Sequence, residues 1–175
     1  MITPEYLAKC GSEHGEQSAL FCWAAKAMWQ GFERANCMAN YLVPPPQGFT
    51  GVPFVEDLRW MHAIPNGGGR SARQGADLKA EGVKGGVADV CLPVPRGQHH
   101  GLYIEMKKAK GVPSDVSKEQ LEFGKFVLAR GYVWIVCFGW QQAAKIIQTY
   151  LEGRELKWED LSPHQAKVMQ KARGE

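Results

Sequence analysis

The sequence lacks the features by which a disulfide framework or a structural zinc site is recognised. Its 175 residues include five cysteines, an odd number, and no two of them form a C-x-x-C pair. Cys10 and His14 have i,i+4 spacing, but no second pair of ligands follows them, and structural zinc needs four ligands in all. We therefore expect a reducing compartment, with Cys91 and Cys137 as small residues inside strands.

A secretory leader and a long apolar run are also missing. Residues 1–6 contain no basic segment followed by an apolar one, so no signal peptide is recognised. The most apolar stretch, residues 126–140, is interrupted by Arg130 and Gly131 and is too short to span a bilayer. These absences predict a cytoplasmic protein without a membrane partner.

The composition is that of an ordinary soluble domain, and its charge is unevenly placed. Hydrophobic residues make up 45% of the chain and charged residues 22%, and the length suits a single domain over residues 1–175. The net charge is only +3, yet residues 70–130 hold eleven Lys or Arg against seven Asp or Glu. Such a local excess favours a phosphate-backbone ligand, although a mixed solvated surface gives the same count.

Hydrophobic periodicity and Gly/Pro breaks predict an α/β fold with a mixed central sheet flanked by helices. The expected core covers about residues 12–150. The expected elements are, in order, a helix over 13–38 capped by Ser12, a Pro-rich loop over 40–54, a strand over 57–64, a helix over 71–81 ended by Gly82, a hairpin with arms near 86–94 and 101–109, a helix from Ser114 or Asp115 to Arg130, a strand over 132–138, a helix over 141–151, and a charged, weakly helical or flexible tail from Lys157. The segment over 111–138 is a helical crossover that returns the last strand parallel to its neighbour.

The hairpin is the most informative segment. If its arms pair antiparallel about Gly97, Asp89 lies opposite Glu105, although a bulge in the loop would shift this register. Side chains alternate between the two faces of a sheet, so the face opposite the acids is entirely apolar. That apolar face comprises Ala88, Val90, Leu92, Leu102, Ile104 and Met106.

The acidic face of the hairpin has the chemistry of a metal site. Directly opposed Cβ atoms lie about 4.5–5.5 Å apart, so Asp89 and Glu105 repel each other unless a cation lies between them. Oxygen donors suit Mg²⁺ or Mn²⁺. Lys107 shares this face two residues after Glu105. The alternative is a surface salt bridge between these acids and Lys107 or Lys108.

The combined pattern resembles the PD-(D/E)xK nuclease superfamily and, more closely, the VRR-NUC family of virus-type replication-repair nucleases. The resemblance extends over roughly residues 12–150, and one departure is Ala88 where the family often has proline before the motif aspartate. The residues that carry it are Glu16-Gln17, Ala63-Ile-Pro-Asn-Gly-Gly, Leu78-Lys-Ala-Glu-Gly-Val, Gly86-Val-Ala-Asp89, Gly101-Leu-Tyr-Ile-Glu105-Met-Lys107, Gln120 and Gly131-Tyr.

The resemblance implies roles for five side chains and one carbonyl. Asp89 and Glu105 hold the metal together with the backbone carbonyl of Met106, and Lys107 orients the attacking water and stabilises negative charge. Glu16, favoured over its neighbour Glu13, faces the metal directly or through water, and Gln120 points back toward the site. The alternatives without a functional role are an ordinary carboxylate on a helix surface for Glu16 and a surface amide for Gln120.

Five basic residues are candidates for contacts with the DNA backbone. Arg70 and Arg73 follow a glycine run that does not end in Gly-Lys-Ser/Thr and so is not a P-loop. The other three candidates flank the hairpin: Lys84, Lys108 and Lys110.

These observations predict a Mg²⁺- or Mn²⁺-dependent DNA endonuclease. By resemblance it is structure-specific, acts on branched DNA as Holliday-junction resolvases do, and forms a homodimer. The dimer interface would be built by apolar residues spread around the first helix, namely Phe21, Trp23, Met28, Trp29 and Phe32. The alternatives are a monomeric flap or single-strand nuclease and a non-catalytic DNA-binding subunit.

Overall fold

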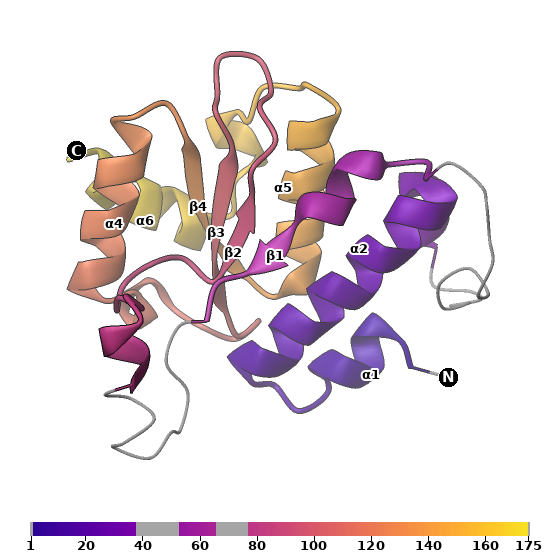
Figure 1. The fold of residues 1–175 in the computed structure, drawn as a ribbon, viewed down its shortest axis with the longest axis horizontal. Helices are drawn as coiled ribbons and strands as arrows, with labels where there is room; N and C mark the ends of the chain where they lie inside the picture. The colour runs from indigo at the N-terminus through magenta and orange to yellow at the C-terminus, as the bar shows by residue number, and fades with distance from the viewer. Residues whose placement is uncertain (1, 38–52, 66–76, 175) are drawn as a thin grey trace.

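The computed structural model describes residues 2–37, 53–65 and 77–174, and it contains a mixed four-stranded sheet between helices (Figure 1). This confirms the predicted fold class. The helices are α1 (Pro4–Ala8), α2 (Glu13–Asn36), α4 (Lys118–Leu128), α5 (Trp140–Leu151) and α6 (Pro163–Arg173), with 3₁₀ turns η1 (Glu56–Trp60), η2 (Pro113–Asp115) and η3 (Trp158–Asp160). The strands are β1 (His62–Ala63), β2 (Val90–Leu92), β3 (Leu102–Lys107) and β4 (Val133–Phe138).

The strands lie in the order β1-β2-β3-β4. β2 pairs antiparallel with β3 through Val90 and Ile104 and through Leu92 and Leu102, which is the register predicted about Gly97. β4 returns parallel to β3 through α4, so the predicted helical crossover is also confirmed. The hairpin strands are shorter than expected, because only residues 90–92 keep the ladder with β3.

Two helical layers cover the sheet (Figure 1). One face carries α2 and α5, and the other carries α4 and α6. The six apolar hairpin residues, from Ala88 to Met106, are each at most 1% exposed, as alternation predicted. On the opposite face, Tyr103 packs edge-on against Phe123 of α4. Both faces of β3 are therefore buried, and polar side chains on it must find partners inside the protein.

The long N-terminal helix begins as expected. The hydroxyl of Ser12 accepts a hydrogen bond from the Gly15 N–H at 3.0 Å, which satisfies one unpaired amide at the helix start. α2 ends at Asn36, two residues before the predicted end, and it is kinked at Gly31, whose φ is +81°. Trp23 is fully buried and stacks on Phe32, with ring centroids 5.9 Å apart.

The strand predicted over 57–64 is wrong for most of its length. The structure has a 3₁₀ turn, η1, over Glu56–Trp60 and only two residues of strand in β1. Leu58 and Met61 are buried and Trp60 is 60% exposed. Buried positions three apart fit a 3₁₀ turn, whereas a half-buried strand would bury every second residue.

The start of the crossover helix differs from expectation, and the C-terminal tail takes the helical one of its two predicted forms. α4 is capped by Ser117 rather than Ser114 or Asp115, which lie in the separate turn η2. The tail is an ordered helix, α6, whose Val168 and Met169 join the core. The Gln165 side chain donates a hydrogen bond to the carbonyl of Val136 at 3.0 Å, which covers part of the free edge of β4.

Several expectations fall on the undescribed parts of the chain. The Pro-rich loop over 40–54 and the start of the helix predicted over 71–81 lie largely outside the described residues, but that helix ends at Gly82 as predicted, with φ of +93°.

All five cysteines are free thiols, and Cys91 and Cys137 are buried. Within the described residues, no helix is both long and apolar enough to cross a membrane.

Candidate active site

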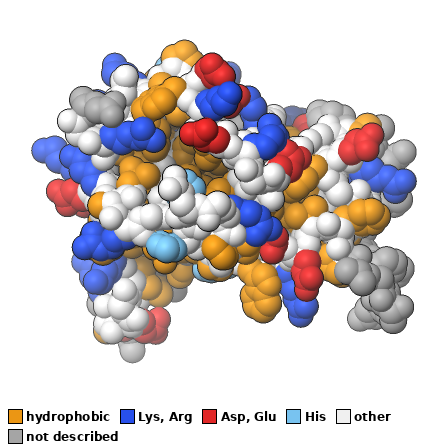
Figure 2. All heavy atoms as spheres, turned by 90° about the horizontal axis from the view of Figure 1, so that it is seen from above, with side chains coloured by type: hydrophobic (Ala, Val, Ile, Leu, Met, Phe, Trp, Pro, Cys, Tyr) orange, Lys and Arg blue, Asp and Glu red, His pale blue; other side chains and the backbone are white. Residues whose placement is uncertain are grey.

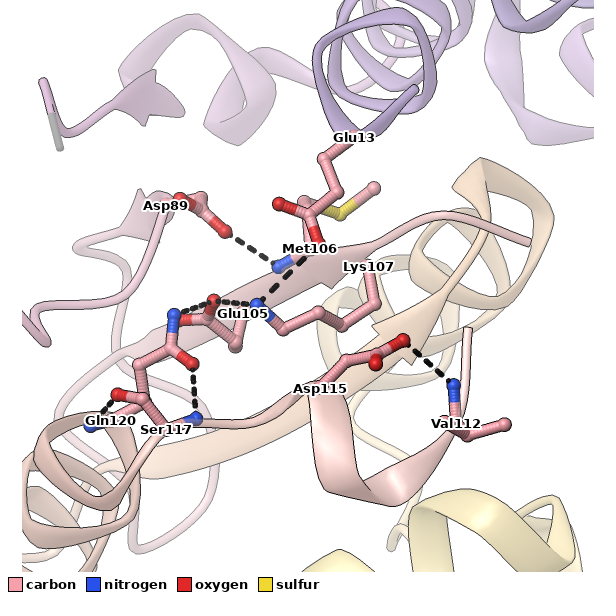
Figure 3. Close-up of polar contacts among 9 residues, drawn as sticks. All are labelled: Glu13, Asp89, Glu105, Met106, Lys107, Val112, Asp115, Ser117 and Gln120. Atoms are coloured by element: carbon pink, nitrogen blue, oxygen red, sulfur yellow. Dashed lines mark hydrogen bonds and ion pairs between the residues drawn. The ribbon is translucent and has the colours of Figure 1, made fainter. Parts of the chain in front are cut away.

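The acidic residues of the hairpin meet the starts of two helices at the carboxyl end of β3 (Figure 3). α2 contributes Glu13, and α4 contributes Gln120. Asp89 lies directly before β2 and accepts a hydrogen bond from the Met106 N–H at 2.8 Å through Oδ2. This hydrogen bond holds the Asp89 carboxylate beside β3, the strand that carries Glu105.

Glu105 is the most constrained acid of the site. Its side chain is 1% exposed, and Oε1 accepts hydrogen bonds from the Gln120 amide and from Lys107 Nζ, the latter at 3.1 Å. Oε2 is buried without a hydrogen-bond partner. Burial and the nearby Asp89 carboxylate raise the pKa of Glu105 from 4.5 to about 8, although Lys107 opposes the shift. One buried oxygen therefore remains available for a cation.

Lys107 lies between two carboxylates. Its ammonium is 3.1 Å from Glu105 and 3.6 Å from Glu13, and the side chain is 5% exposed. Burial alone would lower the pKa of Lys107, but the negative charges of Glu105 and Glu13 outweigh it and raise the pKa. Lys107 thus remains a cation in a region where water is largely excluded, which strengthens its field.

The first turn of α4 holds Gln120 in place. Ser117 and Gln120 form a capping box, in which Gln120 N–H donates to the Ser117 hydroxyl at 3.2 Å and Ser117 N–H donates to Gln120 Oε1 at 2.8 Å. The same amide then uses Nε2 to donate to Glu105. The side chain points back toward the site, as the resemblance implied. The Ser-x-x-Gln spacing was the sequence signal for the true start of this helix.

The structure separates the two candidate glutamates of α2. Glu16 is 3% exposed, and its Oε2 accepts a hydrogen bond from the Trp140 N–H at 3.0 Å, so it caps the start of α5. Glu13, one turn earlier, is the carboxylate that reaches Lys107. Residues three apart lie on similar helical faces, and spacing alone did not distinguish them.

The proposed DNA-contacting residues fall into two groups. Lys84, Lys108 and Lys110 are exposed, and the latter two follow directly after β3. Arg70 and Arg73 lie outside the described residues.

Few residues of the site can supply oxygen ligands to a metal ion. Among the described residues, no three His, Cys, Asp or Glu side chains gather as a ready metal cluster. The Met106 N–H points to Asp89, and in a β-ladder a residue turns its N–H and C=O toward the same edge. The Met106 carbonyl therefore lies on the Asp89 side of β3. The carboxylates of Asp89 and Glu105, the latter with an unpartnered buried oxygen, and this carbonyl fit a hard divalent cation that keeps some of its waters.

The fold is similar to that of a solved structure. A chain described as a VRR_NUC domain protein matches with a TM-score of 0.54 and 22% sequence identity, over 83% of this chain and 93% of that chain. This similarity confirms the predicted fold, a mixed sheet flanked by helices, as one shared with that VRR_NUC domain protein. No protein-family model and no curated protein matches the sequence.

Proposed function

We propose that the protein is a divalent-metal-dependent nuclease that hydrolyses phosphodiesters in DNA. The observation that carries the proposal is the state of Glu105. This carboxylate is buried beside a second carboxylate, with one oxygen bound by Gln120 and Lys107 and the other without a partner. Burying one carboxylate beside another is unfavourable without compensating positive charge, and Lys107 reaches only Oε1 of Glu105. A structural salt bridge gives no reason to leave the second oxygen unpaired.

Each residue of the site would have a separate role in the reaction. Asp89, Glu105 and the Met106 carbonyl would hold Mg²⁺ or Mn²⁺, which supplies Lewis acidity and lowers the pKa of bound water. Lys107, held by Glu105 and Glu13, would orient the attacking water and stabilise negative charge on the phosphate. Gln120 would fix the orientation of Glu105 through a hydrogen bond from an amide that its own helix cap holds in place.

The finer proposal is a homodimer that cuts branched DNA in the manner of a Holliday-junction resolvase. Two symmetric sites suit the two strands that must be cut in a four-way junction. Trp23 cannot contribute to the interface as expected, because it is fully buried within the chain. Phe21 and Met28 of α2 are only partly buried and remain available. Monomeric cleavage of flaps or single strands is the competing form of the same chemistry.

The decisive experiment is a cleavage assay on labelled four-way junction, flap and linear duplex DNA. Unaltered protein with Mn²⁺ should cut, and Asp89→Ala protein or addition of EDTA should abolish cutting. Glu122→Gln removes an exposed carboxylate from α4 outside the site and should cut normally. Cleavage that survives both EDTA and Asp89→Ala would overturn the metal mechanism. Cutting of flaps but not junctions, by a protein that sediments as a monomer, would overturn the finer proposal.

A further inference from the structure

A surface hollow of about 310 Å³ lies beside Asp89 of the candidate active site. Val87 borders the hollow and lies two residues before Asp89, so their Cα atoms are at most about 7 Å apart. Ile64 borders it from the chain that follows β1 and donates its N–H to the Asp89 carbonyl at 2.7 Å. Two walls of the hollow are therefore direct neighbours of a carboxylate proposed to hold the metal.

The walls of the hollow are held in place by the surrounding chain. Gly82, with φ of +93°, ends the preceding helix, and the Val83 N–H donates to the Leu78 carbonyl at 2.9 Å. This bond belongs to a Schellman cap, which fixes the direction in which the chain leaves a helix. At Gly86 the chain runs against the first turn of α4, because an added Cβ would lie 2.6 Å from Cβ of Glu119. The segment that forms the wall is thus anchored to the helix that also carries Gln120.

The chemistry of the walls favours a flat, neutral ring over a phosphate. Ile64, Pro65, Val83 and Val87 supply aliphatic surface, against which a ring can bury its faces. Glu81 also borders the hollow. Its carboxylate repels a phosphate, but it can accept hydrogen bonds from the amino groups of adenine, cytosine or guanine. A volume near the lower end of the roughly 300–1,000 Å³ range of ligand pockets suits one base rather than a base pair.

The phosphate that accompanies such a base has a cation nearby. Lys84 borders the hollow and is exposed, so its ammonium can neutralise a backbone phosphate while the base lies against the aliphatic wall. The opposite end of the molecule has a different surface. Figure 2 looks onto that end, from the side of the hairpin loop, and shows Lys and Arg side chains interspersed with Asp and Glu. Mixed charges of this kind give no extended positive field for a polyanion.

A base inside a duplex is stacked and paired, so it reaches a protein pocket only when it is unpaired or extruded. We propose that the hollow receives the unpaired base of a nucleotide adjacent to the phosphate that is cut. The substrate class is then DNA with an unpaired nucleotide at the cut, as in a flap, a bulge or an open branch point. This inference rests on the proposed nuclease function and adds the feature of DNA that the site recognises.

Flap DNA that carries a single 2-aminopurine tests the inference by fluorescence. The probe is placed in turn at each unpaired position near the branch and is titrated with the unaltered protein in EDTA, which prevents cleavage. Fluorescence should rise at one position, because aminopurine emits more strongly when it leaves a stacked strand, and should not change in fully paired duplex. In Mn²⁺ the cut should map next to that position. An abasic nucleotide there should weaken flap binding about tenfold.

Two variants fill the hollow from different segments of the chain. Val83→Phe and Pro65→Phe should each abolish the rise in fluorescence and weaken flap binding about tenfold, with duplex binding unchanged. Pro65 is exposed, so its replacement keeps the test valid if Val83→Phe protein does not fold in urea-unfolding controls. Ile2→Phe adds the same ring at a position that is 56% exposed and does not border the hollow, and it should retain the full rise.

The outcomes separate this inference from the function on which it rests. Cleavage that proceeds normally while no position shows the rise, or while the rise persists unchanged in both filled variants, overturns the inference alone. Equal cleavage of abasic and unaltered flaps also overturns it alone. If no DNA is cut in Mn²⁺, the proposed function fails and this inference fails with it.

Discussion

At the scale of single residues, two glutamates one helical turn apart have different tasks. Glu16→Ala should lower the free energy of unfolding by about 1–3 kcal/mol, because the Trp140 N–H loses its buried acceptor. Glu13→Ala should change that free energy by less than about 0.5 kcal/mol, because its carboxylate is half exposed. It should nevertheless reduce cleavage by loosening Lys107. Urea unfolding and the cleavage assay measure the two effects separately.

The opposite result would support the role at the metal that the resemblance implies for Glu16. If Glu16→Ala retained its stability but lost all cleavage, Glu16 would act on the metal rather than as the cap of α5. The two variants serve as controls for each other, since they remove the same group from the same helix.

The shifted pKa of Glu105 predicts how stability depends on pH. The folded protein holds the Glu105 proton with a pKa of about 8, against an ordinary value of 4.5. Between these values the folded state binds more protons than the unfolded chain, so the free energy of unfolding falls as the pH rises and levels off above about 8. Urea unfolding in metal-free buffers across this range measures the slope.

Added Mg²⁺ should weaken or reverse this trend, because the metal binds the ionised carboxylates and stabilises the folded state by mass action. The Glu105→Gln variant is the control, since it has no proton to lose and should show a flatter profile. A slope that persists unchanged in Glu105→Gln would assign the pH dependence to other groups.

At the scale of elements, α4 depends on a glycine where its backbone crosses a tryptophan. A Cβ added at Gly124 would lie 2.6 Å from Cδ2 and Cε3 of Trp134. Alanine ordinarily favours a helix by up to about 1 kcal/mol over glycine, but this contact forces a buried ring to move. Gly124→Ala should therefore lower the free energy of unfolding by about 1–3 kcal/mol.

The matched control is Gly85→Ala, where the added Cβ meets nothing within 4 Å. Its free energy of unfolding should stay within about 0.5 kcal/mol of the unaltered protein. Thermal or urea unfolding of both variants makes the comparison, and a stabilised Gly124→Ala protein would contradict the close packing of α4 on β4.

Elements with strong periodicity were predictable from the sequence, and short ones were not. The hairpin register follows from alternation about Gly97, so the meeting of Asp89 with Glu105 could be derived on paper. β1 could not, because tertiary burial of Leu58 and Met61 selects a turn where the sequence also allows a strand. The position of Glu16 depends on α5, more than a hundred residues away, and no local pattern encodes such a contact.

At the scale of the whole molecule, the exposed lysines proposed as DNA contacts predict how DNA binding responds to salt. If Lys84, Lys108 and Lys110 each neutralise a phosphate, each Lys→Ala change should reduce the slope of log K against log salt by about 0.9. The loss should be similar for different DNA sequences, because phosphate contacts carry no sequence information. Fluorescence anisotropy over a salt series, with EDTA to prevent cleavage, gives the slopes.

Lys145→Ala is the control for this series. Its side chain is 64% exposed on α5, where it pairs loosely with Asp160 at 3.9 Å. The salt slope should not change in this variant. Equal slopes in all four variants and the unaltered protein would remove these lysines from the DNA interface.

The contact between Glu16 and the start of α5 has a consequence for how the chain is made. The two partners are separated by 124 residues, so at 5–20 residues per second the ribosome needs roughly 6–25 s to add the second after the first. During that interval the apolar face of α2, with Leu20 and Trp23, has no sheet to pack against. Until β3, β4 and α5 have been synthesised, this helix therefore lacks the partners that bury its apolar face in the folded protein.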